Sequence, residues 1–408
     1  MNNGSKRSKR VLVIGGSIAG LMSALLFRRV GWDATVYERA VGDLAGRGAG
    51  LGVSQELIDI MERCGARFEA SAGVLQRAHA WMDRDGAIVF EHRRDLMASA
   101  WARVYQPLRA ALPADAYRQG VALERVEQDA RQVTAYFSDG TTAQADLLVG
   151  ADGVHSTVRR QFLPEVQPAF ANYVAWRGMV EERDMPRETL DAVSGRIVFC
   201  FPPSEMLLCM CVPGAGDDMR PGYRRMYFIW YRTVPQARLA DLFTDVSGRN
   251  HGVSIPPPLI RPELVREMKE HAREVLPTTI CNVVQGAAQP LLQAISDMES
   301  PRMTFGRVAL AGDAAFVVRP HVAGGAGKAA LDAACLVDVL ARDGDVESAL
   351  NAYDGAQHDF GSRIVRHSRY LGADLEGRPT ERDPKRIIRD YGAPNILHDV
   401  DPRRIRTP

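Results

Sequence analysis

The chain has 408 residues, of which 25% are charged and 46% are hydrophobic, and its formal net charge at pH 7 is +1. This composition is ordinary for a globular protein with two or three domains, or with one large α/β domain and an inserted layer, and it gives no reason to expect nucleic acid or a membrane surface as a partner. The six cysteines are scattered, and neither they nor the nine histidines have metal-ligand spacing, so we expect no metal site and a reducing, cytoplasmic location.

Residues 1–10 are polar and basic, and a mostly apolar run follows them, as at the start of a signal peptide. The glycine turn at residues 15–17 interrupts this run, the arginines at 28–29 end it, and no clear small-residue cleavage site follows. We therefore expect residues 1–10 to be a disordered leader of a soluble protein.

The first unit with a recognisable pattern is a strand, a glycine turn and a helix. Residues 11–14 have a buried-strand pattern, and residues 19–30 repeat apolar side chains at helical spacing. Gly15 permits a tight turn, and Gly20 permits close packing of the helix on the strand, so the free N–H groups at the helix start face a pyrophosphate. Ser17 stands where the usual fingerprint has its second glycine, and it adds a hydroxyl donor. For this unit alone, a plain strand–turn–helix is the alternative.

An acidic residue strengthens the nucleotide interpretation. A second strand at residues 34–37 ends in Glu38, about 20 residues after the glycine turn. Dinucleotide-binding folds place a carboxylate there for the ribose hydroxyls. Glu38 therefore favours a nucleotide site over a plain strand–turn–helix.

Two later turns follow buried strands in the same way. A strand at residues 146–149 leads to the Asp-Gly pair at 152–153, and a strand at 308–311 leads to the Gly-Asp pair at 312–313. After a loop over residues 319–327, we expect a helix whose glycine-rich start offers bare backbone N–H groups to a negatively charged ring edge.

These three segments, in this order and spacing, resemble the single-component flavin-dependent aromatic hydroxylases, the family of para-hydroxybenzoate hydroxylase. The resemblance covers most of residues 11–340. It implies an α/β fold: a Rossmann-like FAD-binding domain of the glutathione-reductase type, an inserted mixed or antiparallel sheet that binds the substrate, and C-terminal helices. We expect the FAD-binding domain to comprise residues 11–75, 101–172 and 291–345, the substrate-binding layer 76–100 and 173–290, and a C-terminal helix and tail 346–408.

The alternating pattern of the inserted part predicts strands with one face packed and one face lining a pocket. We expect these strands at residues 173–180, 196–201, 206–212 and 225–231. Helices are predicted at residues 262–276, 328–342 and 346–370, and the proline-rich tail from about residue 372 is expected to wrap a surface or a partner subunit.

The resemblance implies a set of residues that bind FAD. They are Gly15, Ser17, Ile18, Ala19, Gly20, Glu38, Arg39, Arg47, Gly50, Leu51, Gln106, Arg109, Asp152, Gly153, Gly312, Asp313, Gly324, Gly325 and Ala326. Within this set, Arg47 resembles the arginine that neutralises the pyrophosphate and braces the mobile flavin ring, and Gln106 and Arg109 resemble a polar pair along the dinucleotide. Arg159 either meets the phosphates of the nicotinamide cofactor or serves only its own helix region.

The chemistry expected from the resemblance is that of the cofactor. NADH or NADPH, visiting transiently, reduces FAD, O2 adds to give a C4a-hydroperoxide, and one oxygen atom is transferred to an electron-rich ring carbon. Pro320 matches the family's proline beside the flavin, and His321 is then the first candidate for a substrate-contacting acid or base, with a hydrogen-bonded loop histidine as the alternative. Tyr227, Tyr231 and Tyr173 are weaker candidates, with packing in the core as the alternative. His79, His251 and Cys209 could also line the pocket, but no spacing argument places them there.

The expected substrate is a small hydroxylated aromatic ring of the hydroxypyridine type. Two runs support this within the family, residues 101–109 and residues 312–330. Decarboxylative hydroxylation and hydroxylation of a phenol or a urate-like ring are alternatives, as are a flavin oxidase or dehydrogenase and a non-catalytic binding protein that keeps the fold. A homodimer is the family's expected assembly.

Overall fold

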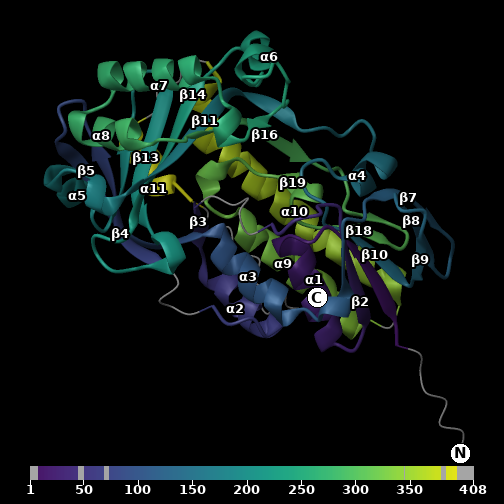
Figure 1. Cartoon of the computed structure of the whole chain (residues 1–408). Coiled ribbons are helices and arrows are strands. Elements are labelled where there is room, and N and C mark those ends of the chain that lie inside the picture. The colour runs from purple at the N-terminus through teal and green to yellow at the C-terminus, as the bar shows by residue number, and fades with distance from the viewer. Residues whose placement is uncertain (1–7, 45–49, 69–72, 344, 378–382, 393–408) are drawn as a thin grey trace, which may run out of the picture.

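The computed structural model describes residues 8–44, 50–68, 73–343, 345–377 and 383–392, and all structural statements below concern these residues. Figure 1 shows two sheets side by side, with a long helix running along both. Arg47 lies outside the described residues, as do residues 1–7 of the expected leader. The leader's last residue, Arg10, already belongs to the first strand, so the expected disorder does not extend to it.

The first layer is a six-stranded sheet with the spatial order β17-β18-β10-β1-β2-β6. Neighbouring strands are parallel except for the antiparallel pair β17 and β18. The strands are β1 (Arg10–Ile14), β2 (Asp33–Glu38), β6 (Tyr117–Gln119), β10 (Leu147–Gly150), β17 (Thr304–Phe305) and β18 (Val308–Leu310). Their short, almost wholly buried apolar sequences are typical of a parallel sheet covered on both faces.

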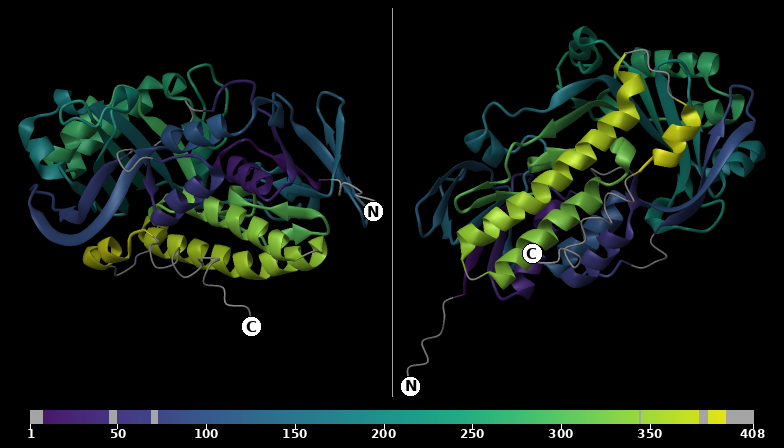
Figure 2. Two further views of the ribbon diagram at one scale, coloured as in Figure 1. Left: turned by 90° about the horizontal axis from the view of Figure 1, so that it is seen from below. Right: turned by 180° about the vertical axis from the view of Figure 1, so that it is seen from behind.

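Helices cover this sheet and join it to the second layer. They are α1 (Ile18–Arg29), α2 (Gln55–Cys64), α3 (Trp101–Ala111), α9 (Gly325–Arg342) and α10 (Val346–Gly372). Residues 18–27 of α1 are all buried, because this helix is enclosed between the sheet and other helices. The view from behind in Figure 2 shows α10 extending across both halves of the molecule.

The second layer is a ten-stranded sheet with the order β15-β16-β11-β14-β13-β12-β4-β5-β3, and a further strand, β19, pairs with β16. It is mixed, as predicted, because β12 and β4 are parallel whereas its other pairs are antiparallel. The strands are β3 (Gly50–Val53), β4 (Val74–Met82), β5 (Ile88–Ala100), β11 (Ala169–Glu181), β12 (Arg196–Cys200), β13 (Glu205–Val212), β14 (Arg225–Thr233), β15 (Ser254–Ile255), β16 (Leu291–Glu299) and β19 (Phe316–Val317).

The two faces of this sheet have different surroundings. On one face, alternate residues such as Trp176, Leu207 and Phe228 pack against α5 (Arg187–Val193), α7 (Pro262–Val275) and α8 (Thr278–Gly286). On the opposite face, Met210, Tyr227 and Ile229 belong to a separate core. The predicted alternation is therefore confirmed, since Met210 and Ile229 line a cavity.

Three strands join a different sheet from the rest of their predicted segments. β3, β16 and β19 fall in the segments predicted to form the FAD-binding domain, but their hydrogen bonds place them in the ten-stranded sheet. Short strands flanked by loops carry too little periodicity to show which sheet they join.

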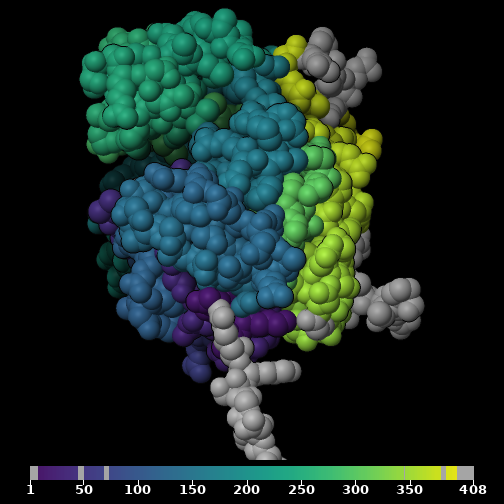
Figure 3. All heavy atoms as spheres, turned by 90° about the vertical axis from the view of Figure 1, so that its right-hand side faces the viewer, coloured from purple at the N-terminus to yellow at the C-terminus, as the bar shows by residue number. Residues whose placement is uncertain are grey.

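A smaller unit lies at the edge of the six-stranded sheet. It consists of the three-stranded sheet β7 (Leu123–Gln128), β8 (Val133–Phe137) and β9 (Thr142–Ala145), together with α4 (Thr157–Phe162). Arg307 connects this unit to the sheet by donating to the carbonyl oxygens of Ala130 and Asp146. Figure 3 shows these blue segments beside the green and yellow segments from the C-terminal part of the chain.

The part of the C-terminal tail that the structure describes packs on this chain's own sheet. α11 (Pro384–Asp390) lies against the open face of the ten-stranded sheet, where Ile387 and Ile388 are buried. The remaining described elements are the short helix α6 (Leu239–Leu242) and a set of 3₁₀ turns that include η8 (Gly312–Ala314), η9 (Pro320–Val322) and η10 (Ala373–Glu376).

Candidate active site

Two connected cavities occupy the junction of the two layers. The larger, here called the strand-end cleft, has a volume of about 710 Å³ and lies along Gly15, Glu38 and Asp152. The smaller, the inner cavity, has a volume of about 320 Å³ and lies between Met210 and Ile229 on one side and the loop at residues 318–326 on the other. They share a wall formed by Ser17, Gly50, Leu51, Trp101, Ala151, Gly153, Arg177 and Asp313. Open α/β sheets bind ligands at the carboxyl ends of their strands, which is where the cleft lies.

The turn between β1 and α1 has the geometry that its glycines predict. Gly15 has φ +105°, a conformation that favours glycine. A Cβ atom on Gly20 would lie 1.8 Å from the Gly15 carbonyl oxygen, so a side chain there would push the helix away from the turn. Ser17 is the N-cap of α1 but its side chain makes no capping hydrogen bond. The N-terminus of α1 and the Ser17 hydroxyl therefore form a site suited to an anion in the cleft.

Glu38 is held in place at the end of β2 by backbone groups. Gly16 N–H donates to one carboxylate oxygen (2.7 Å), and Ala40 N–H donates to the other (2.8 Å). Glu38 is largely buried but lines the cleft, with Arg39 next to it. Each carboxylate oxygen has a further lone pair, so the group can accept hydrogen bonds from ribose hydroxyls in the cleft.

Asp152 and Arg159 fix the loop that follows β10. The Asp152 carboxylate accepts hydrogen bonds from the Ser156 hydroxyl (2.5 Å) and from Thr157 N–H (2.6 Å). Burial raises the pKa of Asp152 above its ordinary value, and these hydrogen bonds oppose that shift. The buried Arg159 guanidinium donates to the carbonyl oxygens of Val154 (2.7 Å) and Ala314 (3.1 Å). Arg159 thus joins the Asp-Gly loop to the Gly-Asp loop, a role that neither sequence alternative described.

A buried ion pair supports the turn at Gly312 and Asp313. Lys328 Nζ lies 2.6 Å from Asp332 Oδ2 and donates to the Gly312 carbonyl (3.2 Å), while Gly312 N–H donates to the same Asp332 oxygen (2.8 Å). The side chains of both charged residues are almost completely buried. Sequence reasoning missed this pair, although a lysine and an aspartate four positions apart in an apolar helix were a usable signal.

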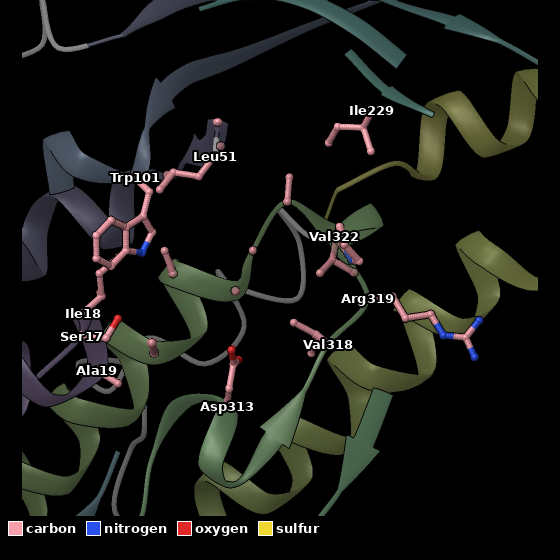
Figure 4. Close-up of a pocket in the computed structure, with 18 of the residues that line it drawn as sticks. Ser17, Ile18, Ala19, Leu51, Trp101, Ile229, Asp313, Val318, Arg319 and Val322 are labelled. Atoms are coloured by element: carbon pink, nitrogen blue, oxygen red, sulfur yellow. The ribbon is translucent and has the colours of Figure 1, made fainter. Parts of the chain in front are cut away.

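Asp313 itself points into the cavity (Figure 4). Asp313 is exposed to this space, yet desolvation by the surrounding protein raises the pKa of its carboxyl, with Lys328 opposing the shift and Asp332 adding to it. The position suits a carboxylate that accepts hydrogen bonds from the hydroxyls of a polyol chain.

The loop before α9 brings backbone N–H groups to the inner cavity. α9 begins at Gly325, earlier than the predicted start after residue 327, and its N-cap Gly324 supplies no side chain. Gly324, Gly325 and Ala326 all line the cavity, as the sequence predicted. The N-terminus of an 18-residue helix therefore faces this space and favours negative charge there.

Two carboxylates, of which Asp297 is buried and Glu376 partly buried, anchor the start of this loop. Arg319 Nε donates to Asp297 (2.7 Å), and its Nη1 donates to Glu376 (2.6 Å). Figure 4 shows the Arg319 side chain pointing away from Asp313 and toward the C-terminal helices. Pro320, the next residue, lines the inner cavity.

Arg177 is a cation shared by both cavities, and sequence reasoning did not select it. It lines both cavities from the middle of β11, and its Nη1 donates to the Tyr227 hydroxyl (3.3 Å). Among the described residues, no carboxylate forms an ion pair with Arg177. The available signal was an arginine within the otherwise apolar stretch at residues 173–180. Trp101, Met210, Ile229 and Tyr391 also line the inner cavity and were not selected.

His321, the first candidate for a substrate-contacting acid or base, does not line either of the two cavities. The turn η9 directs Pro320 and Val322 to the cavity, whereas the fully buried His321 side chain lies behind them. Its Nε2 is hydrogen bonded to the Tyr173 hydroxyl (2.8 Å), and its ring lies 4.4 Å from that of Tyr231. A catalytic role for His321 stays a prediction. In this position its side chain would not touch a substrate bound in either cavity.

The other weaker candidates do not line either cavity. Tyr227 is buried directly behind Arg177, and Tyr173 and Tyr231 are buried in the same face of the sheet. The remaining three lie in different surroundings: His79 beneath α11, Cys209 in the opposite core and His251 beside Asp245.

Most of the predicted cofactor-binding residues meet at the two cavities. Those that line a cavity are Gly15, Ser17, Ile18, Ala19, Glu38, Arg39, Gly50, Leu51, Asp152, Gly153, Asp313, Gly324, Gly325 and Ala326. Gly20 and Gly312 support the wall from behind. Gln106 is exposed on α3, and Arg109 stacks on the Tyr117 ring at 4.1 Å; neither lines either of these two cavities.

The donor set fits FAD. The α1 N-terminus fits a pyrophosphate, Glu38 and Asp313 fit sugar and polyol hydroxyls, and the α9 N-terminus fits the electronegative edge of an isoalloxazine. Within the part of the chain that the structure describes, no group of three His, Cys, Asp or Glu side chains could hold a metal ion. No helix within that same part is long and apolar enough to cross a membrane.

Comparisons with known proteins agree with this fit. Residues 170–297 match a family model described as FAD binding domain-like, and residues 261–368 match one described as FAD binding domain. The chain is 30% identical to 2,6-dihydroxypyridine 3-monooxygenase of Paenarthrobacter nicotinovorans over 91% of this chain and 93% of that protein. It is also 30% identical to 3-amino-4-hydroxybenzoate 2-monooxygenase of Streptomyces cremeus over 90% and 88% of the two chains.

A solved structure extends the likeness to three dimensions. The structure of 2,6-dihydroxypyridine-3-hydroxylase from Arthrobacter nicotinovorans superposes with a TM-score of 0.86 at 29% identity, covering 93% of this chain and 96% of that one. The predicted fold is confirmed by this match. Because the sequence identity extends along nearly the whole chain and the site fits FAD, we conclude that the chain belongs to the family of FAD-dependent aromatic-ring monooxygenases.

Proposed function

We propose that this monooxygenase hydroxylates a small ring that binds as an anion, a hydroxypyridine such as 2,6-dihydroxypyridine. The observation that carries the proposal is Arg177, a cation on the cavity wall whose described surroundings offer it phenols and no carboxylate partner. A partly buried cation without a counter-ion is costly, so a ligand that brings negative charge is favoured. Hydroxypyridines lose a proton readily enough to supply it.

The rest of the inner cavity suits a flat ring. Met210, Ile229 and Val322 give apolar walls, and Trp101 stands at the opening shared with the cleft. Apolar walls exclude water, and Arg177 holds the ionised ring oxygen at one end of the cavity, which keeps the ring electron-rich and oriented. Bound FAD, reduced by NADH or NADPH, supplies oxygen activated for transfer of one atom to the ring.

We propose the following roles for the FAD-binding residues. The α1 N-terminus with Ser17 binds the pyrophosphate, Glu38 the ribose and Asp313 the ribitol, while Gly324, Gly325 and Ala326 stabilise negative charge on the flavin ring. On this proposal the six-stranded sheet with α1, α9 and α10 is the FAD-binding domain, and the ten-stranded sheet is the substrate-binding layer.

A second candidate substrate class is a hydroxylated benzene ring with a carboxylate. Arg177 could pair with that carboxylate, and the relative from Streptomyces cremeus is named for such a ring. Decarboxylative hydroxylation belongs to the same class. The two classes predict different products from the same enzyme.

The test measures oxidation of NADH and of NADPH by the purified yellow protein with 2,6-dihydroxypyridine, with 3-amino-4-hydroxybenzoate and with no ring. Oxygen uptake, carbon dioxide release and product mass are recorded together. The proposal predicts stimulation by 2,6-dihydroxypyridine and a product heavier by one oxygen atom. Stimulation by the benzoate alone would favour the second class, and hydrogen peroxide as the only product with both rings would contradict both.

Arg177→Met provides the residue-level test. We expect it to lose at least about tenfold in kcat/KM, because the ionised ring oxygen loses its charge-assisted hydrogen bond. Arg196→Met is the matched control, since Arg196 makes only a surface ion pair with Glu91. Equal kinetics for Arg177→Met and the control would contradict the assignment of Arg177.

We further propose a homodimer in a reducing compartment. The six cysteines are all free, which is usual in the cytoplasm. Light scattering coupled to size-exclusion chromatography gives the mass in solution, and a monomer of about 45 kDa would contradict the dimer.

A further inference from the structure

A segment near the C-terminus is fixed across the substrate-binding sheet. We call residues 383–392, which include α11, the C-terminal strap. Its backbone carbonyls receive hydrogen bonds from other elements: Arg94 of β5 donates to Tyr391 O (2.5 Å) and to Arg389 O (3.3 Å), and His367 of α10 bonds to Asp390 O (3.0 Å) and Gly392 O (2.8 Å).

Further contacts fix the middle and the C-terminal end of the strap. Gly392 N–H donates to the His321 carbonyl (3.1 Å), directly beside the Pro320 loop. The Tyr370 hydroxyl donates to the Asp390 carboxylate (2.9 Å), and Ile387 and Ile388 are buried against the sheet. The strap is therefore bonded to β5, η9 and α10 at once, which fixes the position of the residue at its end, Tyr391.

Tyr391 lines the inner cavity together with Arg177. Its side chain is only 4% exposed, and its ring packs edge-on against Phe199 (centroids 4.9 Å apart) and against His79 (5.8 Å). These contacts hold the ring from behind. Burial raises the pKa of the Tyr391 phenol well above its ordinary value, and Arg177 opposes the shift, so the guanidinium and the phenol act on each other. The phenol stays neutral and can donate as well as accept.

Arg177 and Tyr391 make a paired recognition site. The guanidinium only donates hydrogen bonds and prefers an anionic oxygen, whereas the phenol can donate to a second oxygen on the same ring. Met210, Ile229 and Val322, which line the same cavity, have apolar side chains and offer no competing hydrogen-bond donor. A flat ring with two oxygen substituents satisfies both residues, and a ring with one oxygen satisfies only Arg177.

We propose that Tyr391, delivered by the C-terminal strap, binds substrate and with Arg177 selects rings that carry two oxygen substituents. This inference rests on the proposed function, since it names the group that reads the second oxygen. It makes the strap a wall of the active site, and it assigns substrate specificity to a part of the chain far from the three flavin motifs.

The test compares Tyr391→Phe with wild type in ligand titrations of the FAD-loaded protein without NADH. Binding of 2,6-dihydroxypyridine and of 2-hydroxypyridine is followed by the perturbation of the flavin absorbance. Phenylalanine keeps the packing on Phe199 and removes only the hydroxyl. We expect the dissociation constant for 2,6-dihydroxypyridine to rise about five- to tenfold and that for 2-hydroxypyridine to stay unchanged, as for loss of one hydrogen bond. Tyr223→Phe is the matched control, because Tyr223 is half exposed and outside the cavity.

Two results separate the proposals. If wild type binds 2,6-dihydroxypyridine and Tyr391→Phe binds both rings as wild type does, the role of Tyr391 is refuted while the proposed function stands. If wild type binds neither ring, the proposed function fails and the inference fails with it. Arg94→Met adds an independent variant, since loosening the strap should weaken binding of both rings; unchanged binding would show that the strap is no wall of the site.

Discussion

Replacing Lys328 by methionine would remove the cation that compensates Asp332 beneath the Gly312 turn. Methionine has a similar length, so the main change is an unpaired, fully buried carboxylate that still accepts from Gly312 N–H. Breaking a buried ion pair by removing one partner costs about 3–5 kcal/mol. With an unfolding entropy of about 2.1 cal/mol/K per residue, the whole chain has about 0.9 kcal/mol/K, so Tm should fall by about 4–6 °C.

The pH dependence gives a sharper criterion. Burial already raises the pKa of Asp332, and Lys328 opposes that shift, so the variant should raise the pKa further. An acid whose folded pKa is raised binds more protons in the folded state, and its unfolded form ionises near pH 4; stability is therefore lost as pH rises. We expect the difference in Tm from wild type to be larger at pH 8 than at pH 5.

The assay is thermal unfolding of both proteins, with and without added FAD, across that pH range. Lys385→Met is the matched control, because Lys385 is exposed and the same atoms are changed. A loss below about 1 kcal/mol, or a loss that does not depend on pH, would refute the reasoning about the buried pair. Lys328→Met combined with Asp332→Leu should recover most of the lost stability, since no unpaired charge remains.

Three further predictions follow from the same geometry. Gly20→Ala should yield protein with little bound FAD, because its Cβ would lie 1.8 Å from the Gly15 oxygen; the measurement is the ratio of flavin to protein absorbance. At Gly355 a Cβ meets nothing within 4 Å. Gly355→Ala should therefore keep FAD and gain about 0.5–1 kcal/mol in the free energy of unfolding, measured by denaturant titration. Arg159→Met should lower FAD occupancy by separating the Val154 and Ala314 loops, whereas Arg160→Met, at the exposed neighbour, should leave it unchanged; equal occupancy would contradict the bridging role. Burial lowers the pKa of His79 from 6.5 to about 4, so between these pH values the unfolded state binds a proton that the folded state does not. The free energy of unfolding of wild type should therefore fall by about 3 kcal/mol as pH falls through that window. His79→Leu should flatten this loss, and an identical acid dependence of the denaturant midpoints of the two proteins would contradict it.

The flavin half of the site was accessible from sequence because its determinants are local. Gly15, Glu38 and Asp313 each follow a buried strand within a few residues, and the carboxyl ends of parallel strands meet at one edge of a sheet. Local pattern therefore implied the spatial cluster. Position within a motif did not give side-chain direction, so Pro320 lines the cavity while His321, its neighbour, faces the interior.

The substrate half depends on pairings that no local pattern encodes. Arg177 is central only because β11 lies beside β14, which brings Tyr227 behind it. Tyr391 is more than 200 residues away in sequence and meets Arg177 only through the strap. Arg159 and Lys328 were visible as polar residues in apolar surroundings, but their partners, the carbonyls of Ala314 and Gly312, carry no sequence signal.

Substrate specificity can change within the family more easily than flavin binding, because the two halves of the site are built differently. The flavin motifs bind a constant ligand, and their close packing, as at Gly20, tolerates little substitution. The polar end of the inner cavity instead combines one strand residue with one residue at the end of the strap, and the strap is held mainly by backbone carbonyls. Carbonyl acceptors are independent of side-chain identity, so the residue at position 391 can vary while the strap stays bonded. Substitutions at position 391 should therefore alter ring selection without loss of FAD, whereas substitutions at Gly20 should cause loss of FAD without altering which ring is selected.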